Sequence, residues 1–413
     1  MGIRRRMPRL ENGLHLLTKG YGWLPDKRRA AGRRTVTARL GGLPVTAIEG
    51  PEAARFLYDE EHVRRAHAIP EPVQGTLFGK GAVHTLDGEE HRVRKAMFVA
   101  LLMREDAISS LVEQATTAWD AAVAEWSGRP QIVLMDEAAP VIAGAVTRWA
   151  GIPVGDAEVP GLARDLTAMV DGFATVGPRH FRARRARIRR EAWLEQLVRD
   201  VRSGTATVPA GSVVQVVAEH LDADGRRLDA RVAAVELLNV IRPTTAIAWF
   251  MAFSGHALIR WPEHRARLAE GDAVFAEAFA HEVRRFYPFA PFIGGRAPQE
   301  LEFDGERIPR NSMVLLDLYG QNHDADLWPD PYAFRPERFL AREIGAFELV
   351  PQGGGDVRSN HRCPGEQLTV ALLSALAVRL ARLEYDVPEQ DLSIALHRIP
   401  ARPASGVVLR VRG

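Results

Sequence analysis

The stretch that decides the fold is PQGGGDVRSNHRCPGEQLTVALL, residues 351–373, which contains the single cysteine of the chain, Cys363. A glycine-rich loop leads to the cysteine, Pro364 occupies a position that the first turn of a helix favours, and an apolar helical pattern follows. A lone cysteine is usually a small buried hydrophobic residue. At the start of a helix, however, free N–H groups and the dipole stabilise a thiolate, and His361 and Arg362 add positive charge. This context favours an anionic sulfur that binds a metal or acts as a nucleophile.

The composition is that of an ordinary globular protein. Of 413 residues, 46% are hydrophobic and 26% are charged, which excludes a disordered chain. A net charge of +2 favours neither nucleic acid nor another strongly charged partner, while the pI of about 8.8 leaves room for a small acidic ligand. One cysteine excludes an internal disulfide and fits a reducing compartment.

The chain is expected to be soluble and cytoplasmic. Its first residues, MGIRRRMPRLENG, are basic, but no apolar segment of the kind found in a secretory signal follows them. The apolar run 241–253 is too short to cross a bilayer and contains Arg242, so no membrane span is predicted.

The pattern of the chain predicts a mainly α-helical protein with small β-sheets, folded as one domain over 1–413. Sheet regions are expected near 34–48, where RTVTARLGGLPVTAI resembles a hairpin, and near 292–318 and 385–412. A last long helix should run from Cys363 to about 384. The other predicted helices are 51–58, 88–103, 109–126, 138–150, 161–176, 180–202, 230–258, 262–269 and 273–286.

Seven arginines lie between residues 179 and 190, and two interpretations compete. Such a run can bind nucleic acid. The preferred interpretation is an amphipathic helix with a solvated basic face. Its apolar side would consist of Phe181, Ile188, Leu194, Leu197 and Val201.

Arg242 and Pro243 are anomalous within the apolar segment NVIRPTTAIAWFMAFSG, residues 239–255. An uncompensated buried charge costs several kcal/mol and a proline inside a helix costs about 3 kcal/mol. Arg242 could pair permanently with Glu236, or its side chain could extend to solvent. A third interpretation is that it awaits an anionic ligand, which a guanidinium binds bidentately.

Three short motifs occur in a fixed order. Glu282 and Arg285 lie three residues apart on one helical face, Arg338 follows within PERF, and Cys363-x-Gly precedes the last helix. Each motif is weak alone, but the ordered set resembles the haem-thiolate cytochromes of the P-450 superfamily over nearly the whole chain.

This resemblance implies the cytochrome P-450 fold, with haem b between a central distal helix and the proximal loop and helix that carry the cysteine. Cys363 would be the axial ligand of the haem iron. Glu282, Arg285 and Arg338 would form a buried structural triad beneath the haem. The family's propionate-binding positions correspond to His91, Lys95, Arg296 and His361, with Lys95 where arginine is usual.

The chain departs from most of the superfamily in two places. Asp356 and Ser359 occupy positions where phenylalanine and glycine are usual, and Arg242-Pro243 replaces the acid and threonine that deliver protons to dioxygen. Both departures resemble the bacterial fatty-acid peroxygenases, whose members hydroxylate at Cα or Cβ or decarboxylate. QGGGD, NHRC-x-GE and the YPFAPF of residues 287–292 agree with that branch.

The resemblance implies a peroxygenase that oxidises long-chain fatty acids with hydrogen peroxide and needs no obligate redox partner. Arg242 would bind the substrate carboxylate, which would in turn move the peroxide proton. Pro243 would leave the carbonyl of Asn239 unpaired and break the helix locally, opening space above the iron. His84 would lie over the haem, where histidine resembles the members that form terminal alkenes. The positions that resemble the substrate-channel wall are Phe78, Val170, Phe173, Ala246, Phe289 and Phe292.

Three other functions remain open from the sequence. A conventional P-450 monooxygenase with redox partners conflicts with Arg242-Pro243. A haem sensor without chemistry would be inert towards peroxide and substrate. A nucleic-acid-binding protein rests on residues 179–190 alone and would bind DNA in a salt-sensitive manner.

Overall fold

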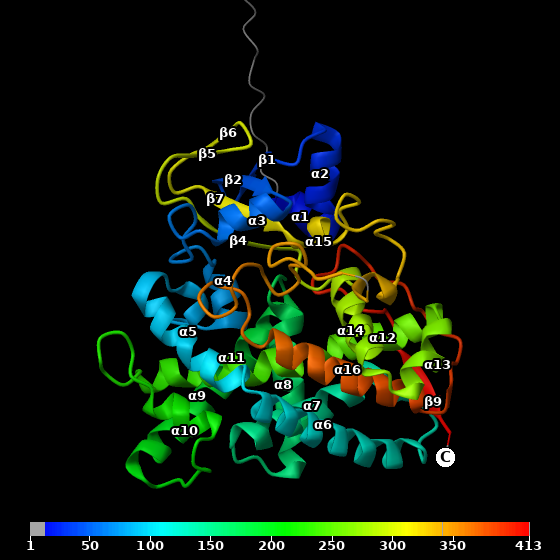
Figure 1. Cartoon of the computed structure of the whole chain (residues 1–413). Coiled ribbons are helices and arrows are strands. Elements are labelled where there is room, and N and C mark those ends of the chain that lie inside the picture. Colours follow the sequence, from blue (N-terminus) through cyan, green and yellow to red (C-terminus); the bar gives the residue numbers. More distant parts are fainter. Residues whose placement is uncertain (1–12, 341, 413) are drawn as a thin grey trace, which may run out of the picture.

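The computed structural model describes residues 13–340 and 342–412 and is mostly helical. A four-stranded sheet lies at one end of the molecule, whereas the last strand lies at the opposite end, near the C-terminus (Figure 1). The long helices of the core are α5 (Gly88–Leu102), α6 (Glu105–Trp126), α7 (Leu134–Ala150), α8 (Val159–Gly172), α9 (Pro178–Ser203), α11 (Ala230–Thr245), α12 (Ile247–Arg260), α14 (Ala273–Phe286) and α16 (Glu366–Arg382). Shorter helices are α1 (Gly13–Lys19), α2 (Trp23–Ala31), α3 (Pro51–Tyr58), α4 (Glu71–Val73), α10 (Val213–Glu219), α13 (Glu263–Glu270) and α15 (Leu318–Asn322).

The main sheet has the strand order β1-β2-β7-β4, formed by Val36–Leu40, Leu43–Ile48, Met313–Asp317 and Phe292–Arg296. β1 and β2 form the predicted antiparallel hairpin, β2 pairs with β7 in parallel, and β4 pairs with β7 antiparallel. The remaining strands are β3 (Ile132–Val133), β5 (Leu301–Phe303), β6 (Glu306–Ile308), β8 (Tyr385–Asp386) and β9 (Val408–Val411). The prediction of a mainly α protein with small sheets in these regions is confirmed.

Side-chain caps and buried apolar faces define the central helices. Asp229 and Asp272 accept hydrogen bonds from backbone N–H groups in the first turns of α11 and α14. α11 and α12 are buried along most of their length, and α7, α9 and α16 pack around them. Two consecutive helices that are buried along most of their length therefore form the centre of the domain.

The predicted single helix 230–258 is instead two helices that meet at Ala246. α11 continues through Pro243, and the regular hydrogen bonding ends three residues later, where the amide of Ala246 contacts the carbonyls of Arg242 and Thr244. The helix was predicted to break at the proline, but it ends at Thr245, two residues later. A missing N–H weakens only the bond to Asn239, and the following turn remains helical.

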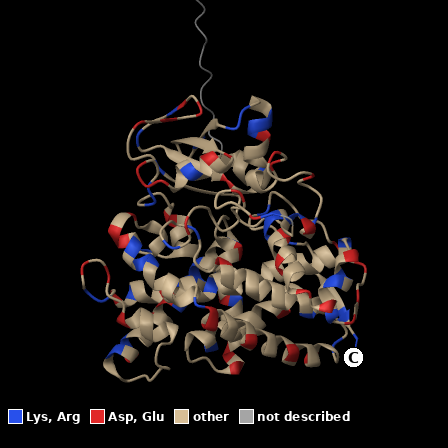
Figure 2. Ribbon diagram, in the orientation of Figure 1, with Lys and Arg blue, Asp and Glu red and all other residues tan. Residues whose placement is uncertain are grey.

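The apolar side predicted for α9 was partly wrong. Phe181 and Ile188 are 61% and 63% exposed, whereas Ala183, Ala186 and Arg187 are buried. Small residues face the neighbouring helices because α8 and α11 pack closely against α9. Most of the arginines pair with acidic residues, including Asp165, Asp171, Glu71 and Glu191, so basic and acidic groups are interspersed (Figure 2).

Other boundaries shifted by a few residues. α7 begins at Leu134 rather than 138, α8 ends at Gly172 rather than 176, and α16 begins at Glu366, so Pro364 lies before the helix and not in its first turn. α1, α2, α10 and α15 were not predicted. No helix among the described residues is long and apolar enough to cross a membrane, and the basic segment 1–12 lies outside those residues.

Candidate active site

Cys363 ends an irregular loop that two ion pairs attach to the start of α16. The amide of Cys363 donates to the carbonyl of Gln352 at 3.0 Å. Glu366 pairs with both Arg362 and Arg284, and Arg284 also donates to the side chain of Gln352. These contacts fix the height and direction of the sulfur relative to the helix.

The three glycines before the cysteine allow close approach of other residues. Gly353 and Gly355 have φ values of +96° and +87°. A Cβ at Gly353 would lie 2.3 Å from the hydroxyl oxygen of Tyr58, and a Cβ at Gly355 would lie 2.6 Å from Oδ1 of Asn360. The glycines therefore bend the loop against α3 and do not surround a phosphate.

The sulfur is set deep among protein atoms although it retains some accessible surface. Burial raises the pKa of the Cys363 thiol above its ordinary value, which the amide of Gly365 and the charge of Lys95 oppose. A neutral thiol is therefore the stable form of the protein alone. Ionisation of Cys363 requires a cation at the sulfur, which is the condition that a metal ligand meets.

Arg242 lies on α11 and is 5% exposed. One of its terminal nitrogens donates to Oδ1 of Asn239 at 3.2 Å, and its Nε has no partner among the described residues. Burial, and secondarily the charge of Arg187, lower the pKa of Arg242 to about 9. Glu236, which could have neutralised Arg242, pairs instead with Arg94 at 2.8 Å. Arg242 is thus a buried cation with spare hydrogen-bonding capacity.

Pro243 follows Arg242 directly in the chain, and His84 is close enough to Arg242 to be repelled by its charge. Pro243 is exposed although Arg242 and Thr244 beside it are buried, so α11 borders accessible volume at this point. His84 lies 4.5 Å from Phe78, measured between ring centres, and its Nδ1 is buried without a partner. Burial, followed by repulsion from Arg242, lowers the pKa of His84 to about 3, so its imidazole is neutral.

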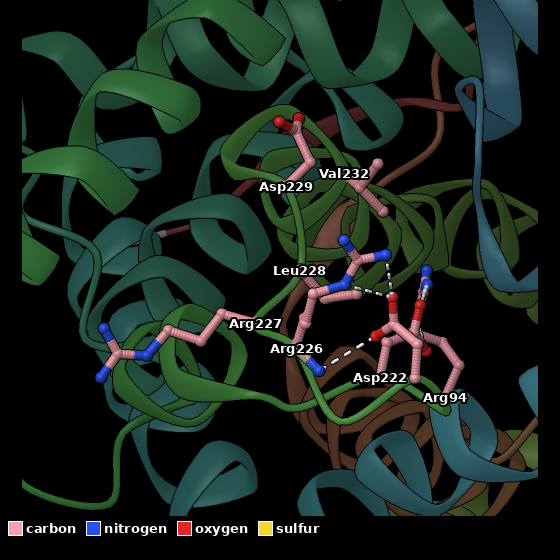
Figure 3. Close-up of a pocket in the computed structure, with 8 residues that line it drawn as sticks. Arg94, Asp222, Arg226, Arg227, Leu228, Asp229 and Val232 are labelled. Carbon is pink, nitrogen blue, oxygen red and sulfur yellow. Dashed lines mark hydrogen bonds and ion pairs between the residues drawn. The ribbon is translucent and has the colours of Figure 1, made fainter.

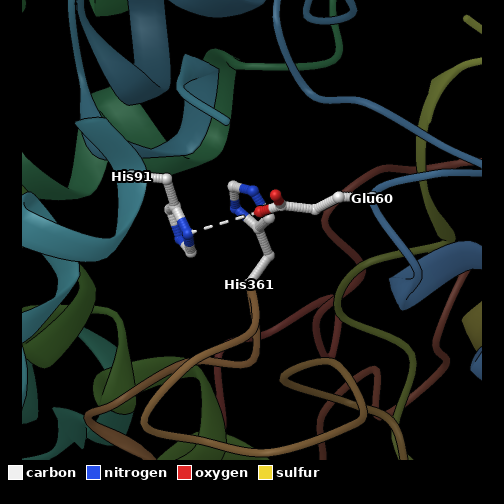
Figure 4. A group of neighbouring side chains, drawn as sticks. All are labelled: Glu60, His91 and His361. Carbon is white, nitrogen blue, oxygen red and sulfur yellow. Dashed lines mark ion pairs between the residues drawn. The ribbon is translucent and has the colours of Figure 1, made fainter. Parts of the chain in front are cut away.

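A second group of side chains gathers from α5, the cysteine loop and the segment before α4. The rings of His91 and His361 stack with centres 3.8 Å apart, and Glu60 lies beside them (Figure 4). Nδ1 of His91 and Nε2 of His361 are buried without hydrogen-bond partners. Burial lowers the pKa of His91 to about 4 and that of Lys95 to about 8.

Arg65 belongs to this group and was not identified from the sequence. It is 7% exposed, contacts the carbonyl of Gly294, and contributes to lowering the pKa of His361. Arg296, predicted for the same role, donates instead to the carbonyls of His67 and Asn311. Spacing in the sequence does not show which of these two arginines lies near His361. Residue 64 pairs with residue 296, at the end of β4, only in the folded chain.

The residues present fit a haem. Near Cys363, Arg65, Lys95 and Arg242 are buried cations, and His84, His91 and His361 have ring nitrogens without partners, while Glu60 and Asp87 lie beside the histidine pair. In a haem-bound protein, His91 and His361 would hold the haem carboxylates and Cys363 would hold the iron, which would supply the cation that the sulfur requires. Glu60, His91 and His361 could also hold a metal ion, but such an ion would leave Cys363 and Arg242 without a counterpart.

Glu282, Arg285 and Arg338 form one buried ion cluster. Glu282 is 0% exposed and accepts two hydrogen bonds of 2.7 Å from Arg285, one of 3.3 Å from Arg338 and one from the amide of Arg335. Arg285 also donates to the carbonyls of Asn322 and Pro331. The cluster attaches α14 to two irregular segments of the chain.

The predicted channel residues lie in four environments. Val170 and Ala246 are buried in the main core, with the ring of Phe289 packed against Phe250 at 5.0 Å. Phe173 packs instead against the cluster that contains Tyr21, and Phe292 packs edge-on against Trp23. Phe78 packs against His84.

Known proteins resemble this chain in sequence and in fold. The family model Cytochrome P450 matches residues 272–404. A variant of cytochrome P450SP alpha (CYP152B1) is 40% identical with a TM-score of 0.95, and the match covers 98% of this chain and 99% of that chain. Ligand-free cytochrome P450 OleT is 36% identical with a TM-score of 0.94, covering 98% of this chain and 97% of that chain.

Curated relatives match over shorter segments. Carnosic acid synthase of Rosmarinus officinalis is 34% identical over 122 residues, which are 27% of this chain and 23% of that protein. The chain covers 23% to 36% of the length of the first three curated relatives. The two solved structures, by contrast, match from end to end. This protein belongs to the cytochrome P450 family, in the fatty-acid peroxygenase branch that contains P450SP alpha and OleT.

Proposed function

We propose that this protein is a cytoplasmic haem b peroxygenase that uses hydrogen peroxide to oxidise long-chain fatty acids at Cα or Cβ. The observation that carries the proposal is Arg242, a buried guanidinium with one neutral side-chain partner and an unpaired Nε. Related solved structures contain arachidonic acid in an OleT variant and (R)-ibuprophen in P450SP alpha, and both ligands are carboxylic acids.

Arg242 binds the carboxylate and fixes which carbons react. A guanidinium holds a carboxylate through two parallel hydrogen bonds, which restrict both position and angle. With the carboxylate fixed on α11, Cα and Cβ are the first carbons that reach the reacting centre, and the rest of the chain fills apolar space. Haem bound through Cys363 supplies the chemistry that transfers an oxygen atom from peroxide.

The substrate carboxylate replaces the missing acid of the distal helix. Arg242 holds this carboxylate on α11, and because His84 is neutral, the carboxylate is the ionised group that can take up a proton there. The carboxylate therefore accepts a proton from one oxygen of peroxide and returns it to the other. No redox partner is needed, because peroxide supplies both the oxygen atom and the oxidising equivalents.

The first test compares a saturated long-chain fatty acid with its methyl ester. The purified haem protein is incubated with each compound and hydrogen peroxide, without reductase, and the products are identified by mass spectrometry. The proposal expects conversion of the free acid alone, at Cα, at Cβ or to the shortened alkene. Failure of both compounds, with activity restored by electron-transfer partners, would instead identify a conventional monooxygenase.

Replacement of Cys363 by serine is expected to abolish peroxide-dependent turnover while leaving the fold intact. A serine hydroxyl does not ionise in this buried position and is a poor ligand for iron. X-ray absorption of the haem-loaded variant should lose the iron–sulfur scattering contribution, and far-UV circular dichroism should be unchanged. Retention of that sulfur signal would show that Cys363 is not the ligand.

Replacement of His84 by glutamine is expected to change the ratio of products more than the total rate. The neutral imidazole and the amide differ in shape and in proton-donating ability, and about 1 kcal/mol between two competing steps changes their ratio about fivefold. The ratio of alkene to hydroxy acid should fall by about that factor. His62→Gln, which alters a ring stacked on Phe56 far from α11, should leave the ratio unchanged.

A further inference from the structure

A chain of ion pairs and hydrogen bonds connects Arg242 with a pocket at the protein surface. Asp222 and Arg94 pair at the edge of that pocket, which Arg226 and Arg227 also line (Figure 3). Arg94 is 3% exposed and donates inward to Oε1 of Glu236 at 2.8 Å. The proposed reaction makes no use of Asp222, Arg94 or Glu236.

Glu236 is fully buried and accepts hydrogen bonds from three directions. Besides Arg94, the amide of Val83 donates to Oε1 at 2.7 Å, and Nδ2 of Asn239 donates to Oε2 at 3.0 Å. Burial raises the pKa of Glu236, and Arg94 and the two N–H donors oppose that shift. Because all three neighbours are donors, the ionised carboxylate, which only accepts, satisfies the site.

The carboxylate determines how the amide of Asn239 is oriented. Nδ2 of Asn239 donates both to Glu236 and to the carbonyl of Phe78 at 3.0 Å, while Oδ1 faces Arg242. Reversing the amide would place its oxygen against two acceptors and its NH2 against the guanidinium. Only the observed orientation provides Arg242 with an acceptor.

We infer that Glu236 is a positioning residue for the substrate anchor, acting through Asn239 on Arg242 and through Val83 and Phe78 on the segment that carries His84. Glu236 and Asn239 together fix the position of Arg242 on α11 relative to Phe78 and Val83. This inference rests on the proposed function. Glu236 acts by keeping the distance between the bound carboxylate and the reacting centre constant.

The test variant is Glu236→Gln, which preserves size and removes the charge. Arg94 and Val83 both require the amide oxygen of the glutamine, so its NH2 must face Asn239. Asn239 then turns its own NH2 towards Arg242, where two donors repel each other. The guanidinium is expected to shift, and a displacement of about 1 Å can cost up to about 10²-fold in rate.

The haem-loaded variant is compared with Glu49→Gln, which removes a partly buried carboxylate that pairs with Arg28 and has no contact with Arg242 or Asn239 among the contacts of the described residues. With a long-chain fatty acid and peroxide, E236Q is expected to lower kcat about tenfold and to spread oxidation beyond Cβ. E49Q should retain the wild-type product positions. Wild-type product positions in E236Q, or the same spread in E49Q, would overturn the inference.

Ligand binding separates orientation from charge. Titration of the haem absorption band gives the affinity for a fatty acid relative to the alcohol of equal length. Misplacement of Arg242 should reduce this preference about tenfold in E236Q. If E236Q acted only by removing a negative charge, the preference for the acid over the alcohol would increase. Glu236 would then no longer compete with the bound carboxylate for Arg242. An unchanged or increased preference therefore contradicts the inference.

Two measurements keep the inference testable if turnover or folding fails. Should the wild type oxidise nothing, the proposed function fails, while hydrogen exchange at the side-chain NH2 of Asn239, which would lose its acceptors on Glu236 and Phe78, still tests Glu236. Faster exchange in E236Q supports the inference and unchanged exchange overturns it. If E236Q does not fold, Glu236→Asp withdraws the carboxylate by one methylene group and should cause the same change in product positions to a smaller degree.

Discussion

Replacement of Arg242 by methionine is expected to lower peroxide-driven oxidation of fatty acids by about 10²- to 10³-fold. The side chain keeps its apolar length but loses both hydrogen bonds to the carboxylate and the charge that attracts it. Without the anchor, neither the carbons to be oxidised nor the proton carrier is held in place. The kcat/KM with a saturated long-chain fatty acid measures the loss, and product analysis shows whether the residual oxidation is still confined to Cα and Cβ.

The same R242M substitution should leave the stability of the folded protein unchanged or increase it. Removing a buried cation that has no acidic partner recovers a desolvation cost of several kcal/mol, whereas Asn239 loses one donor at a cost of about 1–3 kcal/mol. The melting temperature of R242M should therefore equal or exceed that of the wild type. Arg265→Met provides the matched control, because Arg265 caps the carbonyls of Ala381 and Leu383 away from the site. It should lower stability and retain activity; a melting temperature below the wild type for R242M would contradict this account.

Local patterns in the sequence were sufficient for most of the fold. The hairpin at 34–48 follows from alternation around two glycines, and helices such as α3 and α14 coincide with their predicted ranges because caps and apolar periodicity agree. Short helices such as α10 and α15 escaped prediction, since seven or five residues do not establish a period. The break was predicted at Pro243 and lies at Ala246, because the missing N–H of the proline weakens one hydrogen bond and the following turn stays helical.

The candidate site was predictable only where a motif fixed the spacing. Cys363, Arg242 and the pair Glu282 and Arg285 are defined by short motifs, and the structure places each of them in a buried position or deep loop. Arg65 was not identified, because its proximity to His361 depends on how β4 meets residue 64, and the propionate-binding role of Arg296 stays a prediction. Glu236 was weighed only as a partner of Arg242, since Arg94 is 142 positions away in the chain.

Replacement of Glu282 by alanine is expected to destabilise the folded protein by about 3–5 kcal/mol. The substitution leaves Arg285, which is 1% exposed, as a buried cation without its carboxylate, and it also removes an acceptor from Arg338 and from the amide of Arg335. Domains are commonly stable by only about 5–15 kcal/mol, so the loss is a large share of the total. Chemical denaturation followed by circular dichroism should show a lower midpoint with an unchanged slope.

A surface ion pair of the same chemistry supplies the control for Glu282. Glu300 pairs with Arg307, and their side chains are 57% and 74% exposed. Glu300→Ala should change stability by less than about 1 kcal/mol, because solvent already screens the two charges. Both substitutions remove one carboxylate from an ion pair. The difference between their free energies of unfolding therefore measures the effect of burying the pair. Glu282 connects α14 with the segments of Arg335 and Arg338, so E282A should also weaken retention of haem. Equal midpoints for the two variants would show that the buried cluster does not hold those segments in place.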